Sequence, residues 1–519
     1  MGMSEIRKVL IANRGEIAVR VIRACRELDV TTVAVYSDED INALHVKLAD
    51  ESYHIGGAAA KDSYLNIDRI IDTAKKSSVD AIHPGYGFLS ENANFVEACE
   101  KAGIIFIGPK SSTMRFSGDK MAVKQLAKKL GVPVVPASDG ILDDVDKALE
   151  LAKQFGYPVL LKSAFGGGGR GIRLVYNDEQ LRQEFEIATM EAKAAYGRAA
   201  MFVEKYFPRI RHIEFQLLRD MHGNAVYLFE RECSIQRRYQ KLVELAPSPV
   251  VDDNTRNTIG SMVVKLADAI DYINAGTVEF IRDEYTGNFY LIEINSRLQV
   301  EHPVTEMITG KDLVKLQILV ASGKELPFKQ KDLGINGYAI ECRINAEDPM
   351  NDFAPSYGKV GNVSIPYGPG VRVDTYLYPG CNVSGYYDSL VAKVITWGNT
   401  FDEARRRMIN ALNEFYIENI NTTIPLHRFI MNDEAFIKGE LSTDYLDRFN
   451  IISRMQDNFS SSMKANADAI IAATLIYKNL SRYIVTMNSS GDYSNRIKKR
   501  ELSISPWKQV GRMMMRYGV

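Results

Sequence analysis

The N-terminal segment alternates a strand, a helix and a second strand. Lys8–Ala12 is a short apolar run, Glu16–Leu28 carries apolar residues at helical spacing, and Thr31–Tyr36 is rich in β-branched residues. This order predicts a βαβ unit, whose crossover helix makes the two strands parallel. The turn at Asn13–Glu16 has one glycine instead of the GxGxxG pattern of dinucleotide sites, so we interpret it as a tight strand-to-helix turn. We therefore expect the chain to begin with a doubly wound parallel sheet.

Length and charge divide the rest of the chain. At 519 residues it exceeds the roughly 250–300 residues at which a single hydrophobic core stops growing. From the pattern of strands, helices and Gly/Pro-rich turns we place domains at 1–116, 117–331 and 332–449. Residues 450–519 form a basic extension. Positions 451–519 hold eleven Lys or Arg and four Asp or Glu, whereas the remaining chain holds 53 basic and 61 acidic residues.

Composition excludes several classes of protein. A net charge of −1 excludes binding to nucleic acid through bulk positive charge. No apolar run approaches the roughly 18 residues that span a bilayer, and no signal-peptide core is present, so we expect a cytoplasmic protein without membrane contact. The five cysteines form no CxxC pair and the seven histidines no HExxH motif, which makes a zinc site improbable. A metal would need oxygen ligands, which favours Mg²⁺ or Mn²⁺.

A glycine-rich segment follows a strand in the second domain. Pro158–Lys162 is apolar and ends in lysine, and Gly166–Gly169 are four consecutive glycines before Arg170. Glycines let backbone N–H groups close over phosphate oxygens, and the two basic side chains add positive charge. The Walker A pattern GxxxxGK[ST] is absent. We interpret the segment as a phosphate-binding lid, with a plain flexible hairpin as the alternative.

Two carboxylates are expected to face each other on a hairpin around Thr286–Asn288. If Ile281 pairs with Leu291, Glu279 faces Glu293, because strand side chains alternate with a period of two. The same alternation places Asn295 and Arg297 on this face and Val278, Phe280, Ile292 and Ile294 on the other. Facing carboxylates repel each other unless a cation lies between them. The pattern predicts a Mg²⁺ site for nucleotide phosphates, with a solvated polar face as the alternative.

The segment after this hairpin carries two further charged candidates. Arg297 is placed to bind an anion, and Glu301 is placed for a proton transfer. From spacing alone, a structural ion pair explains the same residues equally well.

Taken together, these segments resemble the biotin carboxylase component of biotin-dependent carboxylases, within the ATP-grasp superfamily. The resemblance covers nearly all of residues 3 to 449. The segments that carry it are Val9–Ala18, His83–Asn92, the glycine lid, Glu293–Asn295, Arg297–Pro303 and Glu341–Asp348. The implied fold is α/β and α+β. It has an N-terminal Rossmann-like doubly wound domain, a central ATP-grasp domain with a mobile lid at about 134–207, and a mainly antiparallel C-terminal β domain with helices.

The resemblance also implies an ATP site. Lys120 and Lys162 correspond to lysines on the ATP phosphates, and Gly168 and Gly169 lie in the lid that closes on them. The hinge that holds adenine corresponds to Glu204, Lys205, Tyr206 and Phe207, and the residues near ribose, phosphate and bicarbonate correspond to His212, Gln236 and Lys241.

Further roles follow from the same resemblance. The magnesium ligands correspond to Glu279, Glu293 and Asn295, the bicarbonate pocket to Arg297, Gln299 and Val300, and the biotin site to Arg343 and Tyr86. Glu301 would be the base on bicarbonate, and Arg343 would stabilise the biotin enolate oxygen with a charge that persists at any working pH. Two positions depart from the family pattern. Tyr239 stands where His is usual beside the nucleotide, and Phe165 replaces one lid glycine.

The implied reaction uses ATP to convert bicarbonate to carboxyphosphate, from which biotin on a separate carrier protein is carboxylated. The resemblance favours the first half-reaction of an acetyl- or propionyl-CoA carboxylase. The alternatives are the ATP-dependent subunit of a two-chain pyruvate carboxylase, another ATP-grasp ligase, and a non-enzymatic scaffold. The implied partners are a biotin carboxyl carrier protein, a carboxyltransferase subunit and a second copy of the chain. We expect residues 450–519 to dock on the carrier protein or the carboxyltransferase subunit, with packing on their own C-terminal domain as the alternative.

Overall fold

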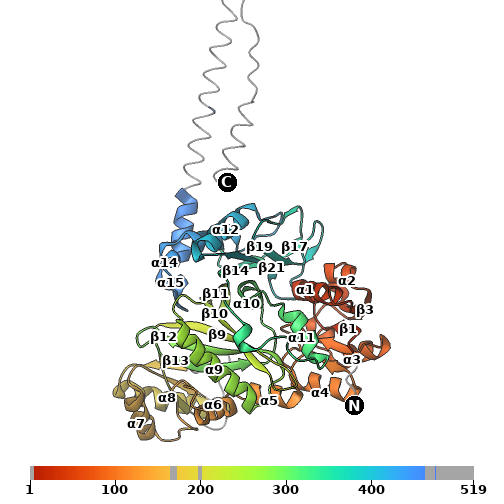
Figure 1. Ribbon diagram of the computed structural model, residues 1–519. Coiled ribbons are helices and arrows are strands. Elements are labelled where there is room, and N and C mark those ends of the chain that lie inside the picture. The colour runs from red at the N-terminus through yellow and green to blue at the C-terminus, as the bar shows by residue number, and fades with distance from the viewer. Residues whose placement is uncertain (1–4, 164–171, 197–200, 462–473, 475–519) are drawn as a thin grey trace, which may run out of the picture. The chain divides into compact units, whose positions relative to one another are not determined.

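The computed structural model describes residues 5–163, 172–196, 201–461 and 474 (Figure 1). Contacts divide the chain into two compact units, Met1–Phe449 and Asn450–Val519. The glycine run and most of the basic extension lie outside the described residues, so the lid closure and the extension's elements stay predictions. In the second unit, residues 451–461 are helical.

The N-terminal domain is a five-stranded parallel sheet in the order β3-β2-β1-β4-β5, which confirms the expected doubly wound sheet (Figure 1). Its strands are β1 (Lys8–Ile11), β2 (Thr31–Ser37), β3 (Glu51–Gly56), β4 (Ala81–His83) and β5 (Ile105–Phe106). Its helices are α1 (Gly15–Arg26), α2 (Leu44–Leu48), α3 (Ile67–Lys76), α4 (Ala93–Ala102) and α5 (Ser111–Gly118), with 3₁₀ turns at Asp38–Asp40 and Ala60–Asp62.

Strand β1 is buried on both faces, as expected of a central parallel strand. Val9 and Ile11 pack in the cluster that contains Ile17 of α1, whereas Leu10 packs on the other side with Ile70 of α3 and Phe95 of α4. The apolar run therefore packs against helices on both faces of the sheet. Asn13 and Arg14 follow its C-terminal end and lie at the sheet edge.

A smaller antiparallel sheet, in the order β7-β6-β8, lies within the residues expected to form the lid. It consists of β6 (Val159–Ser163), β7 (Ile172–Val175) and β8 (Met201–Lys205), covered by α7 (Val145–Phe155) and α8 (Asp178–Tyr196). These elements share a separate hydrophobic cluster. Helix α6 (Lys120–Lys129) precedes them and begins at Asp119, whose carboxylate accepts hydrogen bonds from two backbone N–H groups of its first turn.

An eight-stranded antiparallel sheet runs through the rest of the first unit, in the order β13-β12-β9-β10-β11-β14-β21-β19. It crosses the expected boundary between 331 and 332 without a break, because β11 pairs with β14. Its strands are β9 (Ile210–Arg219), β10 (Ala225–Arg237), β11 (Gln240–Ala246), β12 (Asn274–Asp283), β13 (Phe289–Asn295), β14 (Tyr338–Asn345), β19 (Val371–Thr375) and β21 (Leu390–Gly398).

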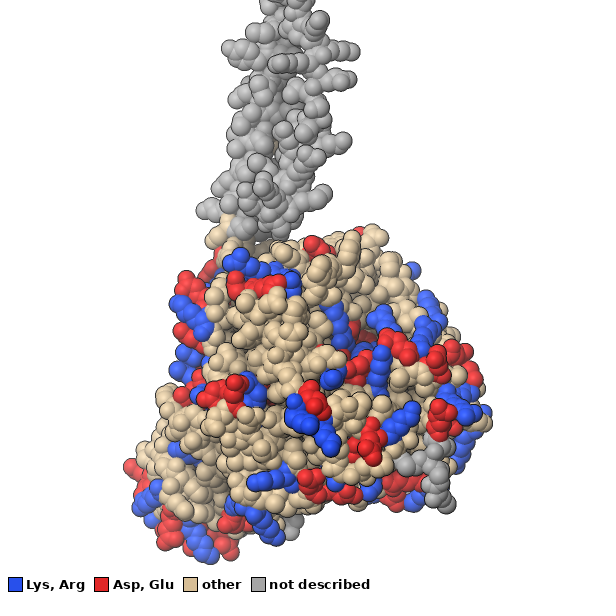
Figure 2. Space-filling model, in the orientation of Figure 1, with Lys and Arg blue, Asp and Glu red and all other residues tan. Residues whose placement is uncertain are grey.

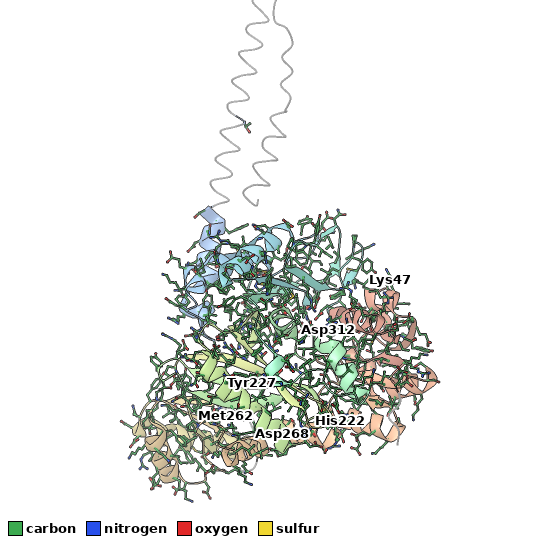
Figure 3. The ribbon with its side chains drawn as sticks, in the orientation of Figure 1. Lys47, His222, Tyr227, Met262, Asp268 and Asp312 are labelled. Atoms are coloured by element: carbon green, nitrogen blue, oxygen red, sulfur yellow. The ribbon has the colours of Figure 1, made fainter. Side chains whose placement is uncertain are left out.

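Helix α9 (Asp253–Ala269) interrupts the stretch that the sequence pattern predicts as mainly strands, and it packs on this sheet. Tyr227 of β10 donates a hydrogen bond to Asn257 Oδ1 of α9 at 2.8 Å, and Met262 packs against the same core (Figure 3). Two more helices, α10 (His302–Thr309) and α11 (Leu313–Ala321), follow the hairpin of β12 and β13.

The remaining elements are short strands, helices and one 3₁₀ turn. They are the 3₁₀ turn Gln330–Asp332, the short strands β15 (Glu347–Asp348), β16 (Ala354–Pro355), β17 (Gly358–Lys359), β18 (Val363–Ser364), β20 (Asn382–Val383) and β22 (Tyr416–Ile417), and the helices α12 (Phe401–Glu414), α13 (Ile424–Asn432), α14 (Glu434–Ile437) and α15 (Tyr445–Arg448). This arrangement confirms the expected mainly antiparallel C-terminal domain with helices. Among the described residues, no helix is long and apolar enough to cross a membrane. Lys/Arg and Asp/Glu side chains are interspersed on the face seen in Figure 2.

Candidate active site

A cavity of about 570 Å³ lies where the N-terminal domain, the ATP-grasp region and the C-terminal domain meet. The site residues expected from the sequence that line it are Tyr86, Tyr239, Lys241, Glu279, Glu293, Asn295, Arg297, Gln299, Val300, Glu301 and Arg343. Most of them lie on strands of the large sheet or directly after β13. The sheet therefore fixes their backbone positions.

The hairpin of β12 and β13 brings the two predicted carboxylates face to face. Glu279 pairs with Glu293, as expected, and Thr277 pairs with Asn295, but the register shifts between Glu279 and Phe280. Ile281 therefore pairs with Tyr290 instead of Leu291, so that part of the prediction is wrong. The bulge makes Leu291, rather than Ile292, a member of the buried cluster with Val278, Phe280 and Ile294.

The donor set at this hairpin fits a hard divalent cation. Two carboxylates and the amide oxygen of Asn295 line one cavity, and oxygen donors of this kind suit Mg²⁺ or Mn²⁺. Glu279 is nearly buried, with Oε2 at 2.9 Å from His212 Nε2 and Oε1 accepting from Gln299 at 2.6 Å. Burial opposes its ionisation, but Lys241 and His212 outweigh burial and lower the pKa of Glu279, so it stays a carboxylate.

Lys241 stands among three carboxylates. Its Nζ donates to Glu214 Oε2 at 2.6 Å, to Glu301 Oε1 at 2.6 Å and to Glu279 Oε1 at 3.3 Å. Burial alone would lower the pKa of this lysine, but the three acidic groups raise it well above its usual range. Lys241 therefore keeps its positive charge in the cavity.

Glu301 is shared between Lys241 and Arg343. Its second oxygen accepts from the Arg343 guanidinium at 2.9 Å, and the pKa of Glu301 is held well below its usual range despite burial. Arg343 also donates through Nε to Glu244 Oε1 at 2.5 Å. The carboxylate of Glu301 thus lies between two fixed cations, which keeps it ionised and oriented.

A fully buried arginine, Arg231 of β10, holds the side chains that surround Lys241 and Glu279. Its guanidinium donates to Glu214 (2.6 Å), Gln216 (2.7 Å), Gln299 (2.7 Å), Thr305 (3.0 Å) and Thr277 (3.1 Å). The amide of Gln299 is therefore fixed at both ends, by Arg231 and by Glu279. Buried charges of this kind remain stable only when every partner is present.

Two buried acidic residues behind Arg343 have raised pKa values. Glu244 of β11 and Glu341 of β14 are directly paired in the ladder, and both are fully buried. Burial raises the pKa of Glu244 to about 7, against the opposing charge of Arg343, and raises that of Glu341 well above its usual range. Two facing carboxyls at such a position cannot both be ionised without cost.

Arg297 is held by an acidic residue from the N-terminal domain. Its Nε donates to Glu91 Oε2 at 2.9 Å, and Glu91 Oε1 accepts from the backbone N–H of Ser296 at 3.3 Å. The terminal guanidinium nitrogens make longer contacts, to Asn295 Oδ1 and the Leu298 carbonyl at 3.3 Å. Arg297 thus presents its outer edge to the cavity while Glu91 fixes its inner edge.

The two lysines expected at the ATP phosphates are paired with carboxylates. Lys120 Nζ lies 2.7 Å from Glu293 Oε2. Lys162 and Lys124 both contact Glu204, at 3.3 Å for Lys124, and the two lysines lower the pKa of Glu204 against its burial. The structure therefore brings Lys120 to the carboxylate pair and Lys162 to the hinge.

The expected hinge residues lie outside the cavity lining. Lys205 donates to the Gly156 carbonyl at 2.6 Å, and the ring of Phe207 stacks on Tyr290 with centroids 4.8 Å apart. Burial raises the pKa of Tyr206. Gln236 donates to the Cys233 carbonyl at 2.8 Å and pairs with Lys241 in the strand ladder.

Tyr86 meets a buried ion pair at the N-terminal side of the cavity. Its hydroxyl donates to Glu16 Oε1, which also lies 3.1 Å from the fully buried Nζ of Lys393. Lys393 in turn donates to the Val300 carbonyl at 2.9 Å. This chain of contacts ties helix α1, strand β21 and the segment after β13 together.

Several of these residues escape sequence reasoning. The sequence pattern alone gives no reason to single out Glu16, Glu91, Glu214, Arg231, Glu244, Glu341 and Lys393, because a charged residue in a strand or a turn indicates a solvated position by default. A weak signal for Glu214 is its place between two apolar residues of β9, whereas Arg231 stands between two glutamates in β10 and has no such signal.

The arrangement has a common chemical property. Each cation that could bind phosphate, bicarbonate or a ureido oxygen is matched with at least one carboxylate, and the carboxylates expected to bind a metal are matched with a lysine or histidine. An anionic substrate can replace the carboxylate partner of a cation, and a divalent cation can replace the lysine or histidine partner of a carboxylate. The net charge of the site then changes little.

Family models match three consecutive stretches of the chain. The model of the biotin carboxylase N-terminal domain matches residues 5–114. The model of the carbamoyl-phosphate synthase L chain ATP-binding domain matches residues 119–329, and that of the biotin carboxylase C-terminal domain matches residues 341–448.

Known proteins show the same similarity. Biotin carboxylase 1 of Bacillus subtilis (strain 168) is 52% identical over 447 residues, covering 86% of this chain and 99% of that protein. A pyruvate carboxylase subunit of Methanothermobacter thermautotrophicus is 49% identical over 486 residues, covering 91% of this chain and 99% of that protein.

A solved structure matches at the level of the fold. It is the crystal structure of the biotin carboxylase domain dimer of the Hydrogenobacter thermophilus 2-oxoglutarate carboxylase, in complex with MgADP, ADP and bicarbonate. The TM-score is 0.78 at 51% identity, covering 86% of this chain and 99% of that chain.

Proposed function

Because this chain belongs to the biotin carboxylase family, and so carboxylates carrier-borne biotin with ATP and bicarbonate, we propose roles for its residues and an acceptor for its product. The observation that carries the roles is the shared position of Glu301 between Lys241 and Arg343 in the cavity. In this position Glu301 can take part in a proton transfer, while the two cations beside it can stabilise an oxyanion.

We assign the divalent cation to Glu279, Glu293 and Asn295, supported by their hard oxygen donors and their common strand face. When bound, the cation neutralises charge on the ATP phosphates. Lys120 and Lys162 contact the same phosphates, and the adenine lies against the hinge Glu204–Phe207. Gly168 and Gly169 close the lid.

Bicarbonate binds between Arg297, Lys241 and the Gln299–Val300 segment. Glu301 takes the bicarbonate proton as the bicarbonate oxygen attacks the γ-phosphorus of ATP, which releases ADP and forms carboxyphosphate. Carboxyphosphate then breaks into CO₂ and phosphate. The phosphate takes the N–H proton of the biotin ureido group, and the ureido nitrogen attacks CO₂.

Arg343 stabilises the negative charge that develops on the ureido oxygen during that proton transfer. Its guanidinium is fixed by Glu244 at 2.5 Å, and its contact with Glu301 couples the enolate site to the base. Tyr86 lines the same cavity and borders the biotin position.

A direct assay tests these assignments. The purified chain should hydrolyse ATP in a bicarbonate-dependent manner, and free biotin should stimulate that hydrolysis. A protein that binds ATP and its partner subunits but gives no bicarbonate-dependent turnover would be a scaffold instead of an enzyme.

For the acceptor of the carboxyl group we propose acetyl-CoA or propionyl-CoA, which a separate carboxyltransferase subunit would bind. A second candidate is pyruvate, because the match to the pyruvate carboxylase subunit of Methanothermobacter covers 91% of this chain. The part of the chain before residue 450 is too short to supply that coverage, so the match includes part of the basic extension. The carboxyltransferase that co-purifies, assayed with acetyl-CoA, propionyl-CoA, pyruvate and 2-oxoglutarate, decides between them.

We also propose that the chain forms a homodimer and receives biotin on a carrier protein. The dimer in the crystal structure of the Hydrogenobacter relative supports the first point. Light scattering of the purified chain tests it. We assign residues 450–519 to docking on the carrier or the carboxyltransferase, supported by their net positive charge in an otherwise acidic chain.

A further inference from the structure

The turn between β10 and β11 has an unfavourable backbone conformation. Strand β10 ends at Arg237 and β11 begins at Gln240, so Arg238 and Tyr239 form a two-residue connection. Their φ angles are 48° and 67°. Positive φ at both positions is the geometry of a type I′ turn, which Asn-Gly normally fills because other side chains are strained there.

A second strained turn belongs to the C-terminal domain. It connects β15 to β16, and its residues Asp352 and Phe353 have φ angles of 45° and 56°. Neither is glycine. Phe353 is buried, whereas the side chain of Asp352 is exposed.

Arg237 joins the two turns. Its guanidinium carbon lies 3.8 Å from the centroid of the Phe353 ring, and it donates to Asp352 Oδ1 at 3.0 Å and to the Asp352 carbonyl at 3.4 Å. Stacking on an aromatic face and a charged hydrogen bond suit the planar arginine side chain. We name this contact of Arg237 with Asp352 and Phe353 the turn clasp.

The clasped turn presents a tyrosine to the cavity. Tyr239 lines the cavity together with Lys241 and Glu279, yet 96% of its surface is exposed. Tyr239 therefore lies at the mouth of the cavity, on the side of Lys241 and the carboxylate pair.

Packing does not explain this strain. A tyrosine that buries almost none of its surface gains little hydrophobic free energy in the folded chain. Residues in sparsely populated backbone conformations persist only when their surroundings over-determine them, and they cluster at ligand clamps. The contacts of the turn clasp hold the turn in this conformation, and the exposed surface of Tyr239 is available to contact a ligand.

We propose that Arg237, Asp352 and Phe353 are positioning residues that hold the β10–β11 turn so that Tyr239 covers the nucleotide in the cavity. The inference rests on the proposed ATP site and adds a contribution of the C-terminal domain to it. The clasp touches neither the carboxylate pair nor Arg343, and the ladder of β10 and β11 holds Lys241 independently of it, so its loss should act on nucleotide binding more than on the chemical steps.

The first test replaces Phe353 with Leu, which keeps apolar volume but removes the ring face. The KM for ATP should rise about tenfold, whereas kcat at saturating ATP should change by no more than about twofold. The matched control is Phe328→Leu. Phe328 is also buried and lies under Lys311 at 4.9 Å, but it does not line the cavity. An equal rise in KM for the control would overturn the proposal.

A double-mutant cycle then asks whether Phe353 acts through Tyr239. Tyr239→Ala alone should raise the KM for ATP, and Phe353→Leu should add little to it in that background. If the two effects multiply instead, the clasp works by another route and the proposal is wrong. If Tyr239→Ala has no effect, the proposal also fails. The biotin carboxylase activity is tested separately, by bicarbonate-dependent ATP hydrolysis of the wild type, and does not depend on this result.

A rescue separates positioning from general loss of stability. Arg238→Asn places a residue that tolerates positive φ in the turn, so the turn needs less support from the clasp. In the Phe353→Leu background it should lower the KM for ATP back toward the wild-type value. A KM that stays high, or rises further, counts against a positioning role.

Discussion

Lys120 Nζ donates a hydrogen bond to Oε2 of Glu293 at 2.7 Å. One residue is assigned to the ATP phosphates and the other to the divalent cation. A cation held by Glu293 would take the place of the lysine, which would then be available to the phosphates. Binding of metal and of nucleotide are therefore expected to support each other.

The first prediction concerns the charge of Glu293. Glu293→Gln removes one negative charge from the cation site at nearly constant volume, so ATP cleavage should be abolished while the fold stays intact. Bicarbonate-dependent ATP hydrolysis at increasing Mg²⁺ checks the rate, and circular dichroism checks the fold. Normal turnover at saturating Mg²⁺ would refute the assignment.

The second prediction concerns Arg297 and Arg343. Either arginine, changed to Ala, should lower biotin carboxylation by about two to three orders of magnitude, because each stabilises developing negative charge. ADP affinity, measured by titration calorimetry, should change little. A parallel loss of ADP binding and rate would mean that these residues bind nucleotide or support the fold.

Glu91 gives a third prediction, since it fixes the inner edge of Arg297 at 2.9 Å. Glu91→Ala should raise the KM for bicarbonate by about tenfold and leave the KM for ATP nearly unchanged. Glu91→Gln keeps an acceptor for Nε and should recover most of the loss. Equal defects in both variants would show that the charge, instead of the orientation, matters.

Stability should depend on pH through Glu16. Burial raises the pKa of this residue to about 7 from 4.5, with Lys393 opposing the rise. Between these values the folded chain binds more protons than the unfolded chain, so the contribution of Glu16 to stability is present below pH 4.5 and is lost as the pH rises through 7.

The measurement is the midpoint of thermal unfolding between pH 5 and 8 at a fixed scan rate. Glu16→Gln does not titrate, so its midpoint should fall less steeply with rising pH than that of the wild type. Exposed Glu440→Gln is the control and should follow the wild type. Parallel curves for all three proteins would exclude Glu16 as the source of the slope.

Much of the hairpin around Glu279 and Glu293 could be predicted from sequence, because side-chain alternation fixes which residues share a face. The bulge at Ile292 could not, since nothing in its composition marks an extra residue in the strand. The conformation of the β10–β11 turn could not be predicted from the sequence for a related reason. Arg238 and Tyr239 have none of the Gly or Asn chemistry that normally signals positive φ.

The buried charges could not be predicted either. Glu214 and Arg231 lie on neighbouring strands and depend on each other, at 2.6 Å, but their partnership is a contact between strands that a linear pattern does not encode. The resemblance to a known family supplied what spacing could not, namely the hinge, His212 and Arg343. The doubly wound N-terminal sheet needed no such help, because apolar periodicity alone predicts it.

A fifth prediction concerns the basic extension. A chain truncated after Asn450 keeps the whole first unit, so it should retain carboxylation of free biotin and lose co-purification with the carrier or carboxyltransferase. Pull-down with each tagged partner checks this. Assembly with wild-type affinity, or unfolding of the truncated chain, would contradict a docking role.

The pairing of β11 with β14 has a practical consequence for anyone who dissects this chain. A fragment that stops at residue 331 removes β14, β21 and β19 and leaves β11 as an open edge, with its backbone N–H and C=O groups unpaired. Open edges of this length recruit other strands, so such a fragment should aggregate instead of binding ATP as a monomer.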